Sequence, residues 1–245
     1  MTTYLVLGAA WLWPSSCHGE YQAGSIPVST AKGIIIIKEI KMTKKPYLGG
    51  DSPPSGIPIL MDSTPNFIEV INNHIYFYSD VDTDRVLKLN KTLRELSGQM
   101  LVQQYNLSLD EPPTIFLHLN SFGGYLFDGL SAMDEILKVR DTVPIHTVVD
   151  GACASAATFM SVVGTHRQMK EHSFMLIHQL TGAFWGKYDS MVDEKINLDL
   201  LMDTIRGIYK QYTKVPKKEL DQILKRDLWW DSSTCFDLGL VDEIV

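Results

Sequence analysis

The sequence predicts an α/β fold made of successive strand–helix units and a long helix near the C-terminal end. Short, continuous apolar runs lie at 114–119, 144–149 and 174–177. Such runs are typical of strands in a parallel sheet that is covered on both faces. The segments between and after these runs carry apolar residues three and four positions apart, which is the period of an amphipathic helix. Strands alternating with helices in this way indicate βαβ units.

Local patterns place the individual elements. Residues 67–78 read as a strand, a turn at Asn72 and Asn73, and a second strand. Pro112 and Pro113 interrupt the chain just before the first core strand. A helical spacing of apolar residues predicts helices at 83–105, 127–139, 155–163, 193–212 and 217–226.

The first part of the chain differs from the rest. Residues 1–65 are rich in Gly, Pro, Ser and Thr and show no sustained period, and 49–58 has the composition of a linker. We therefore predict a poorly structured leader and linker at 1–65 and one folded domain at 66–245. We further expect residues 1–41 to be absent from the mature protein, either because translation starts at Met42 or because a propeptide is removed.

Composition argues against several classes of function. The 245 residues are 45% hydrophobic and 21% charged, with a formal net charge of −7. An acidic chain has no global attraction for phosphate backbones, so we expect no nucleic-acid partner. No apolar run approaches the roughly 20 residues that span a bilayer, so we expect no membrane insertion. The sequence contains no HExxH motif and no glycine-rich phosphate-binding motif, and we expect no metal site.

The cysteines bear on the compartment. Cys17, Cys153 and Cys235 fit neither a disulfide framework nor the spacing of a zinc site. An odd and sparse set of this kind suits a reducing environment. We therefore expect the protein in the cytoplasm, or in the stroma or matrix of an organelle.

One segment has the features of a nucleophile. At 151–155 the sequence Gly-Ala-Cys-Ala-Ser joins an apolar strand to a predicted helix. Ser155 would then lie among backbone N–H groups that have no partner inside the helix, and its small neighbours would let a carbonyl approach. The alternative is a serine that only packs in a contact between small residues, and this segment alone does not decide between the two.

Three further positions could complete a catalytic site. Asn-Ser-Phe-Gly-Gly at 120–124 ends a predicted strand, where ligands bind in α/β sheets, although a plain turn would look the same. His178 directly follows another strand and could act as a general base or be a structural histidine. Asp227 ends a predicted helix and could equally be a surface acid.

The order and spacing of these motifs resemble one family. Besides 120–124 and 151–155, the chain has Leu-Ile-His-Gln at 176–179 and Leu-Gly-Leu-Val-Asp at 238–242. Together they resemble the proteolytic subunit of Clp protease (ClpP), well over 115–245 and loosely over 68–101. Within the family pattern, Phe122 replaces a proline, Ala156 replaces a methionine, and the segment before Phe67 does not match the family's axial loop.

The resemblance implies a crotonase-like fold of stacked βα units with a protruding handle helix, and a serine endopeptidase of the Clp type. It implies that Ser155 is the nucleophile, His178 the general base and Asp227 the residue that orients the base. The backbone amides of Gly124 and Ala156 would form the oxyanion hole. It further implies two stacked heptameric rings, a tetradecamer that encloses a chamber, with unfolded polypeptides as substrates. ATP would be used by a partner AAA+ unfoldase, so no cofactor is expected in this subunit.

Two other functions would fit parts of the pattern. An acyl-CoA hydratase of the same fold would place glutamates around its oxyanion hole, and no glutamate lies near the end of a predicted core strand. A catalytically silent ring subunit would lack part of the triad, whereas Ser155, His178 and Asp227 are all present.

Overall fold

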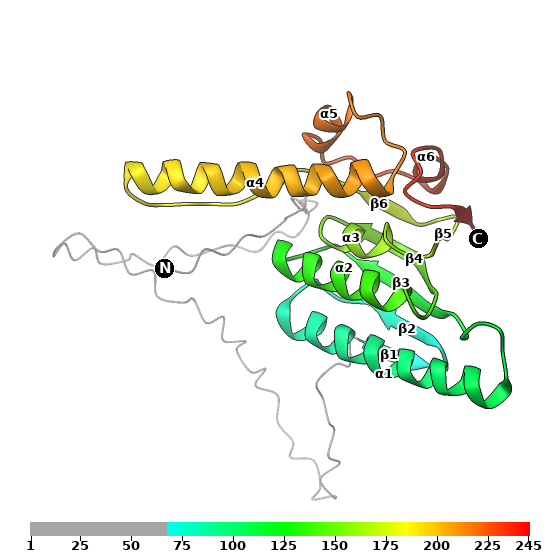
Figure 1. Cartoon of the computed structure of the whole chain (residues 1–245). Coiled ribbons are helices and arrows are strands. Elements are labelled where there is room, and N and C mark those ends of the chain that lie inside the picture. The colour runs from blue at the N-terminus through cyan, green and yellow to red at the C-terminus, as the bar shows by residue number, and fades with distance from the viewer. Residues whose placement is uncertain (1–67) are drawn as a thin grey trace, which may run out of the picture. The chain divides into compact units, whose positions relative to one another are not determined.

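A computed structural model describes residues 68–245, and the mixed α/β class is as predicted (Figure 1). The expectations for the leader and linker at 1–65, including residues 1–41, lie outside the described residues. The strands of the described part are β1 (Ile68–Ile71), β2 (His74–Phe77), β3 (Ile115–Ser121), β4 (Ile145–Ala154), β5 (His166–Met169), β6 (Phe174–Leu176) and β7 (Glu243–Ile244). The helices of the same part are α1 (Thr83–Leu107), α2 (Leu126–Arg140), α3 (Ala157–Ser161), α4 (Tyr188–Tyr212), α5 (Leu220–Leu224) and α6 (Ser232–Asp237).

Within residues 68–245 the strands form one sheet in the order β1-β2-β3-β4-β5-β7, with β6 paired to β4 beside this path. The hairpin of β1 and β2 is antiparallel, and its turn lies at Asn72, whose φ is +55°, as the sequence predicted. The other strand pairs are parallel. Parallel neighbours need crossover connections, which α1, α2 and the segment around α3 provide.

Strand β4 is longer than the sequence predicted, and this length positions the site. It changes partner along its course: Val149 pairs with Met169 of β5, while Ala152 and Ala154 pair with Phe174 and Leu176 of β6. The helix predicted at 155–163 is correspondingly shorter, because its first residues still belong to the turn after β4. Strand β5 was not predicted, since its polar residues His166, Arg167 and Gln168 read as a turn.

Helices α1 and α2 run side by side along the sheet (Figure 1). The Asp82 side chain caps α1 by accepting a hydrogen bond from Arg85 N at 2.9 Å. One face of α1 is apolar and buried, at Val86, Leu89, Leu93, Leu96 and Met100. Arg94 of α1 donates two hydrogen bonds, of 2.6 and 2.5 Å, to the buried carboxylate of Glu135 on α2. This bidentate pair fixes the two helices relative to each other.

Helix α4 has two different halves. Its N-terminal half projects beyond the helices that cover the sheet (Figure 1) and leaves large apolar side chains exposed, namely Tyr188, Met191, Val192, Ile196 and Leu200. Its C-terminal half packs into the core through Ile205, Ile208 and Tyr209. No helix in the described part of the chain is long and apolar enough to cross a membrane.

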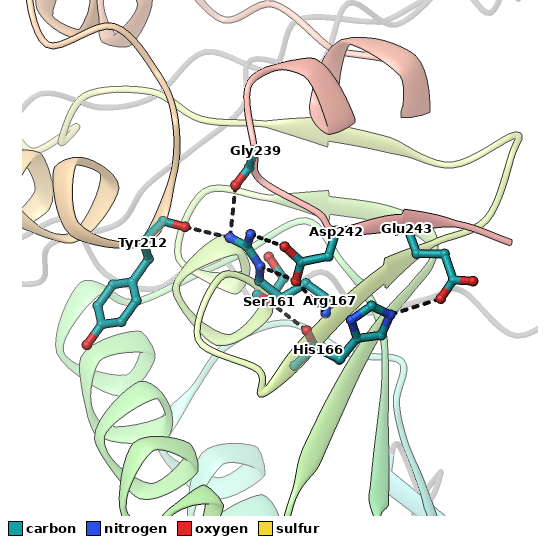
Figure 2. A network of polar contacts seen from close by, with 8 residues as sticks. Ser161, His166, Arg167, Tyr212, Gly239, Asp242 and Glu243 are labelled. Atoms are coloured by element: carbon teal, nitrogen blue, oxygen red, sulfur yellow. Dashed lines mark hydrogen bonds and ion pairs between the residues drawn. The ribbon is translucent and has the colours of Figure 1, made fainter.

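Arg167 of β5 joins the end of α4 to the last strand of the sheet. Figure 2 shows its guanidinium reaching the carboxylate of Asp242 and the backbone carbonyls of Tyr212 and Gly239, at distances from 2.5 to 2.9 Å. Gly239 has a φ of +65°, and a Cβ there would lie 2.6 Å from the Lys214 side chain. The Leu-Gly-Leu-Val-Asp motif therefore has a structural role at this junction.

A glycine in α2 lets this helix approach the turn after β4. A Cβ at Gly129 would lie 2.9 Å from Ala156 Cβ and 3.1 Å from Ala156 O, whereas a Cβ at Gly98 of α1 would meet nothing within 4 Å. We expect Gly129→Ala to lower the free energy of unfolding by about 1–3 kcal/mol through overpacking. Gly98→Ala, the matched control, should raise it by about 1 kcal/mol, because alanine favours the helix.

Urea unfolding of the two variants measures both effects. Equal stabilisation by the two substitutions would contradict the close contact between α2 and Ala156.

Candidate active site

Ser155 adopts an unusual backbone conformation at the end of β4. Its φ is +58°, in the left-handed region that a residue with a side chain seldom occupies. Its backbone N–H donates a 2.9 Å hydrogen bond to Leu176 O of β6, which extends the β4–β6 pairing by one residue. Ser155 is 2% exposed, and its Oγ forms no hydrogen bond within residues 68–245. Strained residues of this kind are concentrated at functional sites.

The loop at 120–124 lies directly against Ser155. A Cβ at Gly123, whose φ is +95°, would be 2.6 Å from Ser155 Cβ, and a Cβ at Gly124 would be 2.1 Å from Val81 O. The loop is held by Val81, which donates to Gly123 O and accepts from Tyr125 N, both at 2.8 Å. A side chain at either position would therefore clash, so both positions require glycine. Support of this loop by Val81 could not be predicted, since a lone apolar residue before a helix carries no such signal.

Two backbone amides near Ser155 have no hydrogen-bond acceptor within residues 68–245. In the described part of the chain, neither Gly124 N–H nor Ala156 N–H donates a hydrogen bond. Gly124 follows Gly123, which packs against Ser155, and Ala156 directly follows Ser155 in the chain. The family resemblance implied these two amides as oxyanion donors, which stays a prediction; the structure packs Gly123, the neighbour of Gly124, against Ser155.

His178 follows β6, the strand that pairs with the end of β4. It is 3% exposed, and its Nε2 has no hydrogen-bond partner among residues 68–245. Its Nδ1 lies 3.4 Å from Asp227 Oδ1, which is longer than a normal N–H···O hydrogen bond. Burial lowers the pKa of His178, and the nearby carboxylate of Asp227 offsets only part of this shift. The imidazole is thus neutral at pH 7.

Asp227 lies in a segment whose two ends are hydrogen-bonded to residues on either side of His178 in the sequence. Leu224 O accepts a hydrogen bond from Gln179 N at 2.7 Å, and Trp230 exchanges two backbone hydrogen bonds, of 2.9 and 2.8 Å, with Met175. The side chain of Asp227 is 59% exposed. A solvated carboxylate exerts a weak field, which is why burial decides the direction of the pKa shift of His178.

An aromatic contact connects this segment to the glycine loop. The rings of Phe122 and Trp229 meet edge to face, with centroids 6.1 Å apart and an interplanar angle of 89°. Phe122 lies two residues before Gly124, and Trp229 lies two residues after Asp227. The contact therefore joins the loop of Gly124 to the segment of the acid.

The other strand histidines are engaged away from Ser155. His118 Nδ1 lies 2.9 Å from Asp150 Oδ2, and His118 Nε2 lies 2.9 Å from His74 Nδ1. Burial alone would raise the pKa of Asp150, but hydrogen bonds from His118, Tyr78 and Lys170 lower it to about 2. Asp150 therefore stays ionised within this network. Among residues 68–245 no group of three or more His, Cys, Asp or Glu side chains could hold a metal ion.

Comparisons with known proteins show which family the chain is similar to. The family model for Clp protease matches residues 71–245. An ATP-dependent Clp protease proteolytic subunit of Chlorokybus atmophyticus is 29% identical over 196 residues, covering 78% of this chain and 85% of that one. The subunit of Solanum lycopersicum is 27% identical over 194 residues, covering 77% and 92%.

A solved structure shares the fold. A ClpP1 point mutant from Listeria monocytogenes superposes with a TM-score of 0.57 at 19% identity, covering 69% of this chain and 88% of that one. Because the family model spans most of the chain and relatives of the same kind cover most of their own length, the chain belongs to the Clp protease family and is a serine peptidase subunit of the Clp type.

Proposed function

We propose that Ser155, His178 and Asp227 form a catalytic triad that hydrolyses peptide bonds of unfolded polypeptides. The observation that carries the proposal is that Ser155 Oγ and His178 Nε2 are both buried and both lack a hydrogen-bond partner among residues 68–245. The two residues follow β4 and β6, which pair with each other. A buried polar atom without a partner is costly and is retained where it has a function. Asp227 approaches the other nitrogen of His178.

The reaction follows the Ser-His-Asp scheme. His178 Nε2 accepts the proton of Ser155 as Oγ attacks the peptide carbonyl, and then gives this proton to the leaving amine. Asp227, beside Nδ1, favours the tautomer that carries its proton on Nδ1 and leaves Nε2 free to accept. Water then hydrolyses the acyl-enzyme by the same proton transfers in reverse. Apo sites often show longer catalytic contacts than the substrate complex, which accommodates the 3.4 Å separation of His178 and Asp227.

The amides of Gly124 and Ala156 would hold the oxyanion of the tetrahedral intermediate. Both belong to backbone that close packing holds rigid, since Gly123 touches Ser155 and Gly124 touches Val81. Donors fixed in advance do not have to reorganise during the reaction. Loss of one such donor typically costs about 3–4 kcal/mol of transition-state stabilisation.

The same proposal includes assembly into two stacked heptameric rings that enclose a chamber. Support comes from the projecting half of α4, whose exposed Met191, Val192, Ile196 and Leu200 form more apolar surface than a solitary helix leaves in water. We propose that an AAA+ unfoldase uses ATP to deliver unfolded chains, as the relatives' name "ATP-dependent Clp protease" suggests, and that this subunit needs no cofactor. The occurrence of such relatives in an alga and in tomato favours an organelle stroma over the cytoplasm.

Replacement of the nucleophile tests the chemistry and the assembly together. We expect Ser155→Ala to lower peptidase turnover by about 10⁴ to 10⁶. The fold should be unaffected, because the Ser155 hydroxyl has no partner to leave unpaired. Cleavage of a fluorogenic peptide measures activity, and sedimentation velocity at micromolar concentration should show rings for both proteins. Retained activity in Ser155→Ala, or a fully active monomer, would contradict the proposal.

The assignment of the acid has a matched control four residues away. Asp227→Asn should lower turnover by up to about 10⁴, because asparagine does not select the productive tautomer of His178. Asp231 caps α6 by accepting from Thr234 N at 2.9 Å, and asparagine caps a helix equally well, so Asp231→Asn should leave turnover unchanged. A crippled Asp231→Asn with an active Asp227→Asn would reverse the assignment.

The pH dependence follows from the pKa of His178. The base is active when neutral, and burial lowers its pKa, so the neutral form persists at a lower pH than for an exposed histidine. The acidic limb of kcat/KM should therefore fall at a pH below about 6.5, the ordinary histidine value. A limb clearly above 6.5 would show that Asp227 outweighs burial, contrary to the exposure of its side chain.

A further inference from the structure

A chain of buried hydroxyl groups connects α4 to the backbone of the proposed nucleophile. Thr158 Oγ1 lies 2.6 Å from Ser155 O and 2.7 Å from Tyr209 Oη. Thr158 is 0% exposed and Tyr209 1%. Thr158 belongs to α3, directly after the nucleophile, whereas Tyr209 comes from the buried half of α4. The two hydroxyl groups thus connect α4 to the turn that contains Ser155.

Chemistry determines the direction of these hydrogen bonds. A carbonyl oxygen only accepts, and a threonine hydroxyl has a single hydrogen. Thr158 therefore donates to Ser155 O, and its oxygen accepts from the phenol of Tyr209. Burial raises the pKa of Tyr209, which keeps the phenol protonated and able to donate. Donors in series polarise each other and strengthen the final bond to the carbonyl.

The carbonyl that receives this chain shares a peptide unit with Ala156 N–H. A peptide unit is planar and trans, so the direction of its C=O fixes the direction of its N–H on the opposite side. Ser155 O also accepts from Thr158 N at 3.0 Å, so two donors orient one carbonyl. Ser155 itself has a φ of +58°, a conformation that persists only where surrounding contacts hold it.

We propose that Thr158 and Tyr209 are positioning residues, which orient Ala156 N–H toward the oxyanion. This orientation then depends on how α4 packs in the core. The inference rests on the proposed function, because it requires Ala156 as an oxyanion donor. An interaction that is made with the oxyanion acts on the transition state and not on the bound substrate. Its loss lowers kcat and leaves KM nearly unchanged.

Four variants of the full chain separate positioning from stability. Thr158→Val keeps the shape of the side chain but leaves the Tyr209 hydroxyl buried without a partner, which destabilises the fold. The double variant Thr158→Val with Tyr209→Phe removes both hydroxyls and leaves no group unpaired, so stability should return. Thr158→Ser keeps the hydroxyl and serves as the conservative control. Tyr209→Phe alone keeps the packed ring and shortens the chain by one donor.

We expect kcat for a fluorogenic peptide to fall about tenfold in Thr158→Val and equally in the double variant, which is part of the 10²- to 10³-fold loss on removal of a whole oxyanion donor. KM should stay within about twofold, and Thr158→Ser should recover kcat. The affinity for a peptide aldehyde, which forms a tetrahedral adduct, should fall by the same factor as kcat. Tyr209→Phe should lower kcat about threefold. If Thr158→Val does not fold, this variant alone tests whether the hydroxyls position Ala156 N–H.

A double variant that regains kcat together with stability would overturn the inference, as would unchanged kcat in Tyr209→Phe and Thr158→Val. Ser155→Ala measured in parallel distinguishes a failure of this inference from a failure of the proposed function. Hydrolysis that depends on Ser155 but is indifferent to both hydroxyls would defeat this inference alone. Hydrolysis that does not depend on Ser155 would defeat the proposed function, and the inference with it.

Discussion

The contact between Gly123 and Ser155 is the constraint on which the rest of the site depends. Only a residue without a side chain fits there, since a Cβ at Gly123 would lie 2.6 Å from that of Ser155. The contact presses the loop that carries Gly124 N–H against a serine in the left-handed region, and the β4–β6 pairing holds this serine through Leu176. Backbone packing thus positions the proposed nucleophile, Ser155, and the loop of the proposed oxyanion donor Gly124.

Electrostatics follow from the same burial. His178 follows the strand that supports Ser155 and is buried like Ser155, so desolvation sets the direction of its pKa shift, while the exposed Asp227 exerts a weaker opposite effect. Because His178 is buried where it follows β6, its neutral form is favoured near pH 7. Asp227 is held through the backbone of Leu224 and Trp230 and through the Phe122–Trp229 contact, and its carboxylate forms no hydrogen bond among residues 68–245.

Part of this arrangement could be predicted from the sequence, because it depends on residues that are close together in the chain. The apolar runs indicated the central parallel strands, and the motifs indicated the glycine loop at 120–124 and Ser155, which the structure packs against each other. The catalytic roles of Ser155 and His178 stay predictions. Other features depend on contacts between distant residues. The change of partner along β4, the support of the glycine loop by Val81, the clamp of Arg167 on Asp242 and the pairing of Thr158 with Tyr209 leave no periodic or motif signal. Strand β5 was missed for a related reason: its polar side chains are typical of a turn, and only its neighbours make it a strand.

We expect His178 to activate one serine of this protein, Ser155, and covalent labelling measures this activation. A fluorophosphonate probe reacts only with a serine hydroxyl that a base activates. Digestion and mass spectrometry of the labelled protein should find the probe on Ser155 alone, and the labelling rate should fall at acidic pH as His178 becomes protonated. Labelling of a different serine, or none at Ser155 in a preparation that still hydrolyses peptides, would contradict the account.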